Sequence, residues 1–141
     1  MKLEVSQVNV WAASLEDRPG NLAAKLKVLA DAGANLEFVI ARRESSQPGT
    51  GVVFVTPLKG ARQTKAAAQA GFAKADNLHS VRVAGPDKPG LGATITHALA
   101  EAGINLRGLS AVAIGKRCVV HLALDSAEDA KKAMQALKAI S

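Results

Sequence analysis

The sequence predicts an α+β protein made of two copies of one βαββα unit, each an antiparallel sheet covered by helices on one face. Three observations lead to this prediction. A block of the first half recurs in the second half, 70 residues later. In each copy, apolar residues alternate in short segments and recur every three or four positions in longer ones, as in strands and helices. Glycines and prolines that form turns separate these segments.

The repeated block runs from Asp17 to Leu36 and returns from Asp87 to Leu106. Ten of its 20 positions are identical. The matches include an Asp-x-Pro-Gly turn and a later Gly-x-Asn, which the abundance of alanine does not explain. This is a tandem duplication, and it predicts two domains, residues 1–77 and 78–141.

Each copy begins with a strand that leads into a helix. Val8, Val10 and Ala12 alternate with other residues along one N-terminal strand, and Val81 and Val83 do so in the second copy. Asp-x-Pro-Gly then predicts a helix start, with Asp near the N-cap and Pro in the first turn. Apolar residues three or four apart form one buried stripe on each helix. The stripes are Leu22, Leu26, Leu29 and Ala30 in one copy and Leu91, Ile95, Leu99 and Ala102 in the other.

A hairpin and a second helix complete each copy. Gly33 and Gly103 end the first helices, because glycine adopts the left-handed conformation that stops a helix. The remaining predicted elements are strands over 36–40 and 52–55 and a helix over 61–73, then strands over 106–114 and 118–124 and a helix over 127–140. A full ferredoxin-like unit, βαββαβ, needs one more strand. We expect Leu78–Ala84 to close the first copy as well as open the second, with Lys2–Ser6 on the vacant edge of the second.

The composition excludes several classes of protein. The formal net charge is +6, shared equally between the repeats, so no basic tail exists for a polyanion. No apolar stretch approaches the roughly 18 residues that span a bilayer. The alternating N-terminus is not a secretion signal, and the single Cys118 cannot build a disulfide scaffold. We therefore expect a cytoplasmic protein.

No catalytic, metal or cofactor site is predicted. The three histidines lack partners at metal-ligand spacing, and Gly90-Leu91-Gly92 lacks the rest of a dinucleotide fingerprint. RNA recognition modules share the βαββαβ order, but they stack bases on strand aromatics, and this chain has no Tyr. The basic pairs at 42–43 and 116–117 are interpreted as solvated hairpin charge. A basic ferredoxin-like nucleic-acid-binding module is the alternative hypothesis, although nucleic acid is not the expected partner.

The order of strand, Asp-x-Pro-Gly turn, helix ending in Ala-Gly-x-Asn-Leu, and hairpin resembles the ACT domain family, small regulatory modules that bind amino acids. The resemblance covers both copies. It implies paired modules, ligands held at the module interface, and Asn35 and Asn105 as acceptors for a ligand ammonium group.

The residues themselves also favour an amino-acid site. The first amides of a helix have no intrahelical acceptor and carry partial positive charge, which suits a carboxylate. We expect a small amino acid to bind there and to change association with a second copy, as a homodimer, or with a regulated protein partner. The predicted binding residues are Leu15, Asp17, Arg18, Gly20, Asn21, Leu22 and Asn35, and Asp87, Lys88, Gly90, Leu91, Gly92 and Asn105.

Overall fold

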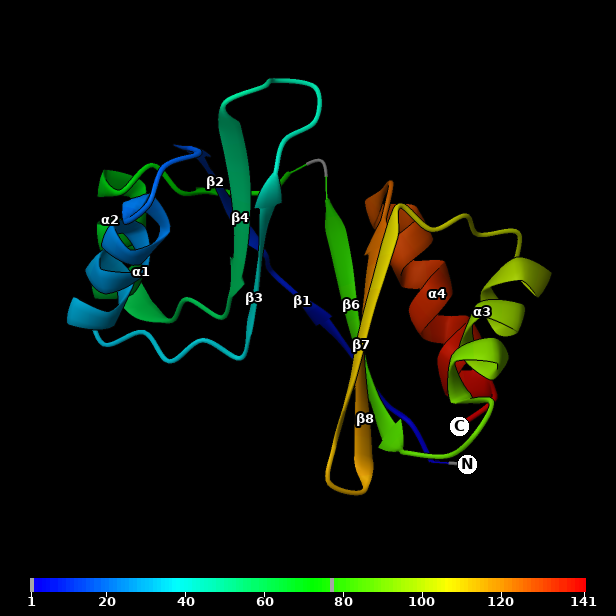
Figure 1. Cartoon of the computed structure of the whole chain (residues 1–141). Helices are drawn as coiled ribbons and strands as arrows, with labels where there is room; N and C mark the ends of the chain where they lie inside the picture. Colours follow the sequence, from blue (N-terminus) through cyan, green and yellow to red (C-terminus); the bar gives the residue numbers. More distant parts are fainter. Residues whose placement is uncertain (1, 77) are drawn as a thin grey trace. The chain divides into compact units, whose positions relative to one another are not determined.

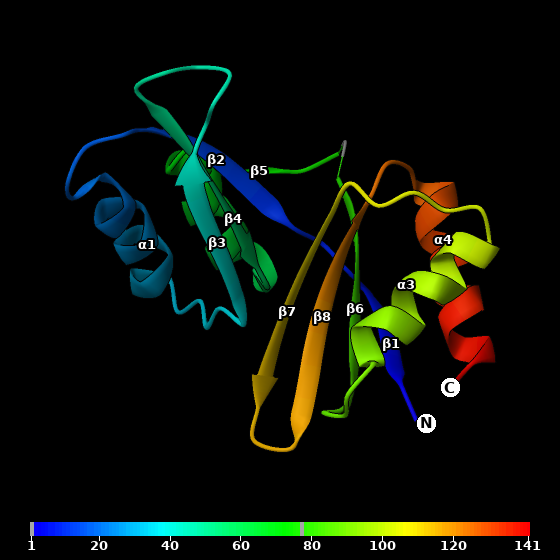
Figure 2. The same cartoon turned by 45° about the vertical axis from the view of Figure 1, so that its right-hand side comes forward.

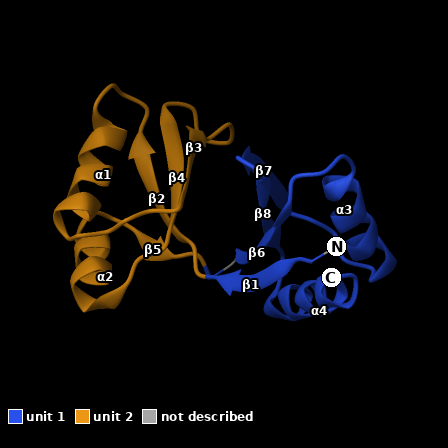
Figure 3. Cartoon of the chain, turned by 90° about the horizontal axis from the view of Figure 1, so that it is seen from below, with its two compact units in different colours: residues 1–8, 76–141 blue, residues 9–75 orange. Residues whose placement is uncertain are grey.

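The computed structural model describes residues 2–76 and 78–141. The chain forms two compact units: unit 1 combines Met1–Val8 with Asp76–Ser141, and unit 2 is Asn9–Ala75 (Figure 3). The predicted boundary at residues 77 and 78 falls beside this division, and residue 77 itself lies outside the described residues. The N-terminal segment, which the sequence analysis assigned to the first repeat, belongs to the unit of the second repeat.

Unit 2, the first repeat, is a four-stranded antiparallel sheet in the order β3-β4-β2-β5. Its elements are β2 (Trp11–Glu16), α1 (Asn21–Asp31), β3 (Phe38–Arg43), β4 (Thr50–Thr56), α2 (Gly60–Gln69) and β5 (Ala73–Lys74). Because β2 and β3 both pair with β4, they are parallel to each other, and α1 crosses the sheet between them. Both helices cover the same face (Figure 1).

Unit 1, the second repeat, has the same architecture, with strand order β1-β6-β8-β7. Its elements are β1 (Glu4–Val8), β6 (His79–Pro86), α3 (Leu91–Glu101), β7 (Gly108–Ile114), β8 (Arg117–Leu124) and α4 (Ala127–Ala139). Helices α3 and α4 cover one face of this sheet (Figure 2). The predicted α+β class with two ferredoxin-like repeats is confirmed.

The N-terminal strand β1 supplies the fourth strand of unit 1. It pairs antiparallel with β6, from Glu4 opposite Ala84 to Val8 opposite Ser80. The expected use of the N-terminus at this vacant edge is therefore confirmed. The prediction of one continuous strand through position 12 is wrong, because the chain leaves one sheet after Val8 and enters the other at Trp11.

The fourth strand of unit 2 is its own two-residue β5. The expectation that Leu78–Ala84 closes the first copy is wrong, since that segment lies at β6 of the other unit. The predicted helix over 61–73 ends at Gln69, because Gly71 adopts φ +89° and turns the chain. Phe72 then enters the core, where it is 3% exposed, and β5 follows.

Each unit has its own hydrophobic core between sheet and helices. The helical stripes contribute Leu29 to unit 2 and Leu91, Ile95 and Leu99 to unit 1, all buried. The prediction that Ala30 and Ala102 are buried with them is wrong, because both are exposed. These helices thus hold the strand–helix loops at fixed positions on the sheets.

Candidate functional site

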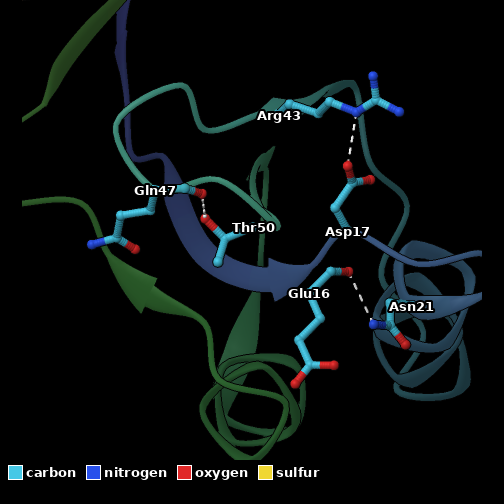
Figure 4. Close-up of polar contacts among 6 residues, drawn as sticks. All are labelled: Glu16, Asp17, Asn21, Arg43, Gln47 and Thr50. Atoms are coloured by element: carbon cyan, nitrogen blue, oxygen red, sulfur yellow. Dashed lines mark hydrogen bonds and ion pairs between the residues drawn. The ribbon is translucent and has the colours of Figure 1, made fainter.

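The loop between β2 and α1 differs from the predicted capping arrangement. Helix α1 begins at Asn21, after Gly20, which occupies the N-cap in the left-handed conformation with φ 89°. No side chain caps the helix. Asp17, the expected capping residue, instead accepts a hydrogen bond from Arg43 Nε at 2.7 Å (Figure 4). The Asp17 side chain therefore links the loop to β3, and the start of α1 has no side-chain cap.

Some main-chain amides of this loop lack a hydrogen-bond acceptor among the described residues. The Asn21 amide, expected to be available, donates to the Arg18 carbonyl at 3.3 Å. The amides of Gly20, Leu22 and Ala23 have no acceptor among residues 2–76 and 78–141. These donors lie at the positive end of the helix dipole, where a carboxylate is stabilised.

Two further contacts hold the loop in place. The Asp17 amide donates to the Gly49 carbonyl at 3.0 Å, which ties the loop to the turn between β3 and β4. The Asn21 side-chain amide donates to the Glu16 carbonyl at 3.0 Å (Figure 4). The amides without acceptors therefore lie in a segment that hydrogen bonds hold in place.

A cavity of about 370 Å³ lies beside this loop, on strands β2, β3 and β4. That volume is at the lower end of the range for small-molecule sites. Its lining comprises Leu15, Glu16, Asp17, Arg18, Pro19, Gly20, Leu22, Ala41, Arg42, Arg43, Gly51 and Val52. Gly51 is buried in the lining, and a Cβ there would lie 3.1 Å from the Arg42 carbonyl oxygen, so the absence of a side chain keeps this part open.

The structure brings five of the seven predicted residues of the first repeat to this cavity: Leu15, Asp17, Arg18, Gly20 and Leu22. Asn21 neighbours them and braces the loop. Asn35 does not join them. It is exposed beyond the far end of α1, and an eleven-residue helix is about 16 Å long.

The loop of the second repeat has the same backbone and a different surface. Gly90 is the left-handed N-cap of α3, the Leu91 amide donates to the Lys88 carbonyl at 3.2 Å, and the Asp87 amide donates to the Lys116 carbonyl at 2.9 Å. The Leu91 side chain is 5% exposed and belongs to the core, so it does not face a ligand.

The remaining predicted residues of the second repeat are exposed. Asp87, Lys88, Gly90 and Gly92 lie at the surface of the loop, and Asn105 lies beyond the far end of α3, as Asn35 does beyond α1. A ligand role for either Asn requires a second module to supply it and stays a prediction.

Sequence reasoning missed the contribution of β3 and β4. Arg42 and Arg43 were interpreted as solvated hairpin charge, and both are exposed, but they also lie in the lining of the cavity with Gly51. The cross-strand register explains the place of Arg43, since Gly51 lies opposite Arg43 on one side and Leu15 on the other. Charged residues about 25 positions from the loop in sequence thus become part of the cavity lining. The two adjacent arginines were the feature of the sequence that could have indicated this part of the lining.

No cluster of three or more His, Cys, Asp or Glu residues able to hold a metal ion occurs in residues 2–76 or 78–141. None of the helices found there has the length and apolar character needed to cross a membrane.

Comparison with known proteins agrees with this architecture. Residues 79–141 match the model of the ACT domain family. None of the curated proteins matches the chain. Among solved structures, protein BT0572 from Bacteroides thetaiotaomicron is similar with a TM-score of 0.78 and 18% identity, over 95% of this chain and 90% of that one.

Regulatory subunits of aspartate kinase are similar as well. The ligand-free subunit from Thermus thermophilus has a TM-score of 0.63 and 18% identity, over 96% of this chain and 93% of that one. The subunit from Thermus flavus has a TM-score of 0.60 and 19% identity, over the same shares. At these identities the likeness concerns the fold.

The chain thus holds two ferredoxin-like units, and in the first of them a cavity and main-chain amides without acceptors among the described residues lie at the strand–helix loop. The match over β6 to the end of α4 identifies the second repeat as an ACT domain. The first repeat shares its element order and half of a 20-residue block with it. The first repeat lies outside the matched residues.

Proposed function

We propose that this chain is a regulatory protein that binds a small amino acid in the cavity of unit 2, and that the bound state changes its association with a second copy or another protein. The observation that carries this proposal is the cavity itself. It combines main-chain donors at a helix start with charged side chains of both signs.

The ligand carboxylate is assigned to the start of α1. The amides of Leu22 and Ala23 lack acceptors among the described residues, and Gly20 has no Cβ to obstruct approach to the main chain. The helix dipole adds partial positive charge. Hydrogen bonds from amides to a carboxylate are charge-assisted and stronger than those between neutral groups.

The ligand ammonium group is assigned to the carboxylates of Glu16 and Asp17, which line the same cavity. Glu16 forms an ion pair with Arg18, and Asp17 with Arg43. These pairs are exposed, so each contributes little to stability, and an arriving ammonium group competes with the arginines at small cost. In this repeat, Glu16 and Asp17 thus take the role that was expected of Asn35, that of acceptor for the ligand ammonium group.

Coupling to association follows from the position of β3. This strand lines the cavity through Ala41, Arg42 and Arg43, and it is the edge strand of its sheet, hydrogen-bonded on one side only. Val39 on the same strand is 43% exposed. An open edge favours pairing with another chain. A ligand that binds the associated state more tightly shifts the population toward it.

Isothermal titration calorimetry of the full chain with each of the twenty common amino acids tests the binding. We expect heat with at least one of them and a matching rise in melting temperature. Asp17→Asn should weaken this binding, whereas Glu37→Gln, which neutralises an exposed acid outside the lining, should not. Sedimentation velocity with and without that amino acid measures association. Absence of heat and thermal shift with all twenty would overturn the proposal.

A further inference from the structure

The cavity beside the β2–α1 loop has an apolar inner wall. Three residues of the lining form this inner wall: Gly51, which is buried, and Leu15 and Leu22, which are half-buried. Both leucines pack against the hydrophobic core of unit 2. The charged residues of the lining are all exposed. The interior of the cavity is therefore apolar, and its charges lie at the protein surface.

The strand register places the inner wall on the face of the sheet that α1 covers. Gly51 lies opposite Leu15 on β2 and Arg43 on β3, so these three side-chain positions share one face. Val53, two residues along β4 from Gly51, is on the same face and is buried in the core under the helices. The side chain of Arg42 points to the other face, because successive residues of a strand alternate. Its charge is therefore not part of the inner wall.

The glycine at position 51 provides space in the inner wall. Gly51 is not among the glycines with positive φ, so its backbone conformation is open to other residues. A Cβ there would be in ordinary contact with Leu15, 3.8 Å from its Cγ atom. The second repeat holds Cys118 at the same register position, opposite Gly85 and Ala113. The fold thus admits a side chain at this position, and glycine leaves the cavity open.

We infer that the cavity selects an amino acid with a small aliphatic side chain, and that Gly51 determines the size that it accepts. The inference rests on the proposed function, because it uses the placement of the ligand given there. With the carboxylate at the start of α1 and the ammonium group at Glu16 and Asp17, the ligand side chain is the group left for the inner wall. A polar side chain would lose hydrogen bonds to water there, whereas an aliphatic one gains contact with Leu15 and Leu22.

Calorimetry on the full chain tests the class of side chain with pairs of amino acids of nearly equal size. The pairs are L-valine with L-threonine and L-leucine with L-asparagine. We expect at least one aliphatic member to bind at least about tenfold more tightly than its polar partner. L-Alanine should bind more weakly than L-valine, by about fourfold for each methylene group that it lacks.

Gly51→Ala tests the role of the glycine. The added methyl group occupies part of the inner wall, so it should weaken the binding of valine and leucine at least about tenfold and that of alanine by less than about threefold. Gly108→Ala is the matched control. It changes a strand glycine of unit 1 outside the cavity, where a Cβ would be in ordinary contact with Ala123 at 3.8 Å, and it should leave all affinities unchanged.

A second variant covers a loss of folding in the first. A Cβ at Gly51 would also lie 3.1 Å from the Arg42 carbonyl oxygen, so a thermal melt of each variant without ligand checks that it is folded. If Gly51→Ala is unfolded, Leu22→Ala decides, because it enlarges the inner wall and adds no atom near β3. It should shift the ratio of valine to phenylalanine affinity toward phenylalanine by at least about fivefold.

Failure of the inference is distinguishable from failure of the proposed function. Threonine and asparagine that bind as tightly as their aliphatic partners, or an acidic or basic amino acid that binds most tightly of all, overturn the inference and leave the proposed function standing. Unchanged affinities in a folded Gly51→Ala variant overturn the role of Gly51. An unchanged affinity ratio in Leu22→Ala overturns the inner wall as the place of the side chain. No binding by any amino acid overturns both proposals.

Discussion

The contact between Leu3 and Gly85 offers a direct test of the N-terminal strand as part of the second repeat. Leu3 is 7% exposed in the core of unit 1. A Cβ added to Gly85 would lie 2.7 Å from its Cδ2 atom. The two positions therefore share one space, which either side chain can occupy in part.

The expected magnitudes follow from this packing. Leu3→Ala removes a buried side chain at the edge of the core and should destabilise unit 1 by about 2 kcal/mol, the lower end for such changes. Gly85→Ala should cost about 1–2 kcal/mol through overpacking. In the double variant the added methyl group enters space that Leu3 has left. The two costs should therefore fail to add, with a coupling of about 1–2 kcal/mol.

Hydrogen exchange measured by mass spectrometry locates the effect. Leu3→Ala should reduce protection in peptides from β6 and β8 and leave those from β2 and β4 unchanged. Leu29→Ala, at a fully buried position of the other core, is the mirror control and should do the reverse. If Leu3→Ala weakened protection in β2 and β4 first, the N-terminal strand would belong with the first repeat and the reasoning would fail.

Three further predictions concern separate features. Lys25→Met should destabilise unit 2 by about 1 kcal/mol, because the Lys25 ammonium group donates to the Ala70 carbonyl and lies 5.9 Å from the centre of the Phe72 ring; an unchanged urea midpoint would contradict this. Ser126→Ala should cost about 1 kcal/mol in unit 1, since the Ser126 hydroxyl accepts from the Asp129 amide at 3.0 Å and caps α4; equal urea midpoints for variant and wild type would refute it. Filter binding at two salt concentrations should detect no tight binding to duplex DNA at about 0.15 M salt, because the +6 charge is spread over both repeats; strong binding that weakens as salt rises would favour the nucleic-acid alternative.

Local signals explain the part of the site that was predictable. The turn, the helix period and the glycine stop lie within about 20 residues of one another, and each depends on local backbone preferences. The position of Gly20 was predictable for that reason. The partner of Asp17 was not predictable from the sequence. A carboxylate at this position can either cap the helix or pair with Arg43, and the register of the sheet decides between the two.

The sequence by itself determined the duplication, the class of fold, the large apolar residues by which the first helix of each repeat packs on its sheet, and the strand–helix loop that lines the cavity. Each of these features depends on the types and spacing of residues that lie close together within one repeat. Only the tertiary structure decided that β1 joins the second repeat and that β5 closes the first. It alone placed Arg43 at the wall of the cavity. Strand partners and cavity walls depend on contacts between segments distant in sequence, and an apolar alternation that fits either sheet equally well does not specify which one it joins.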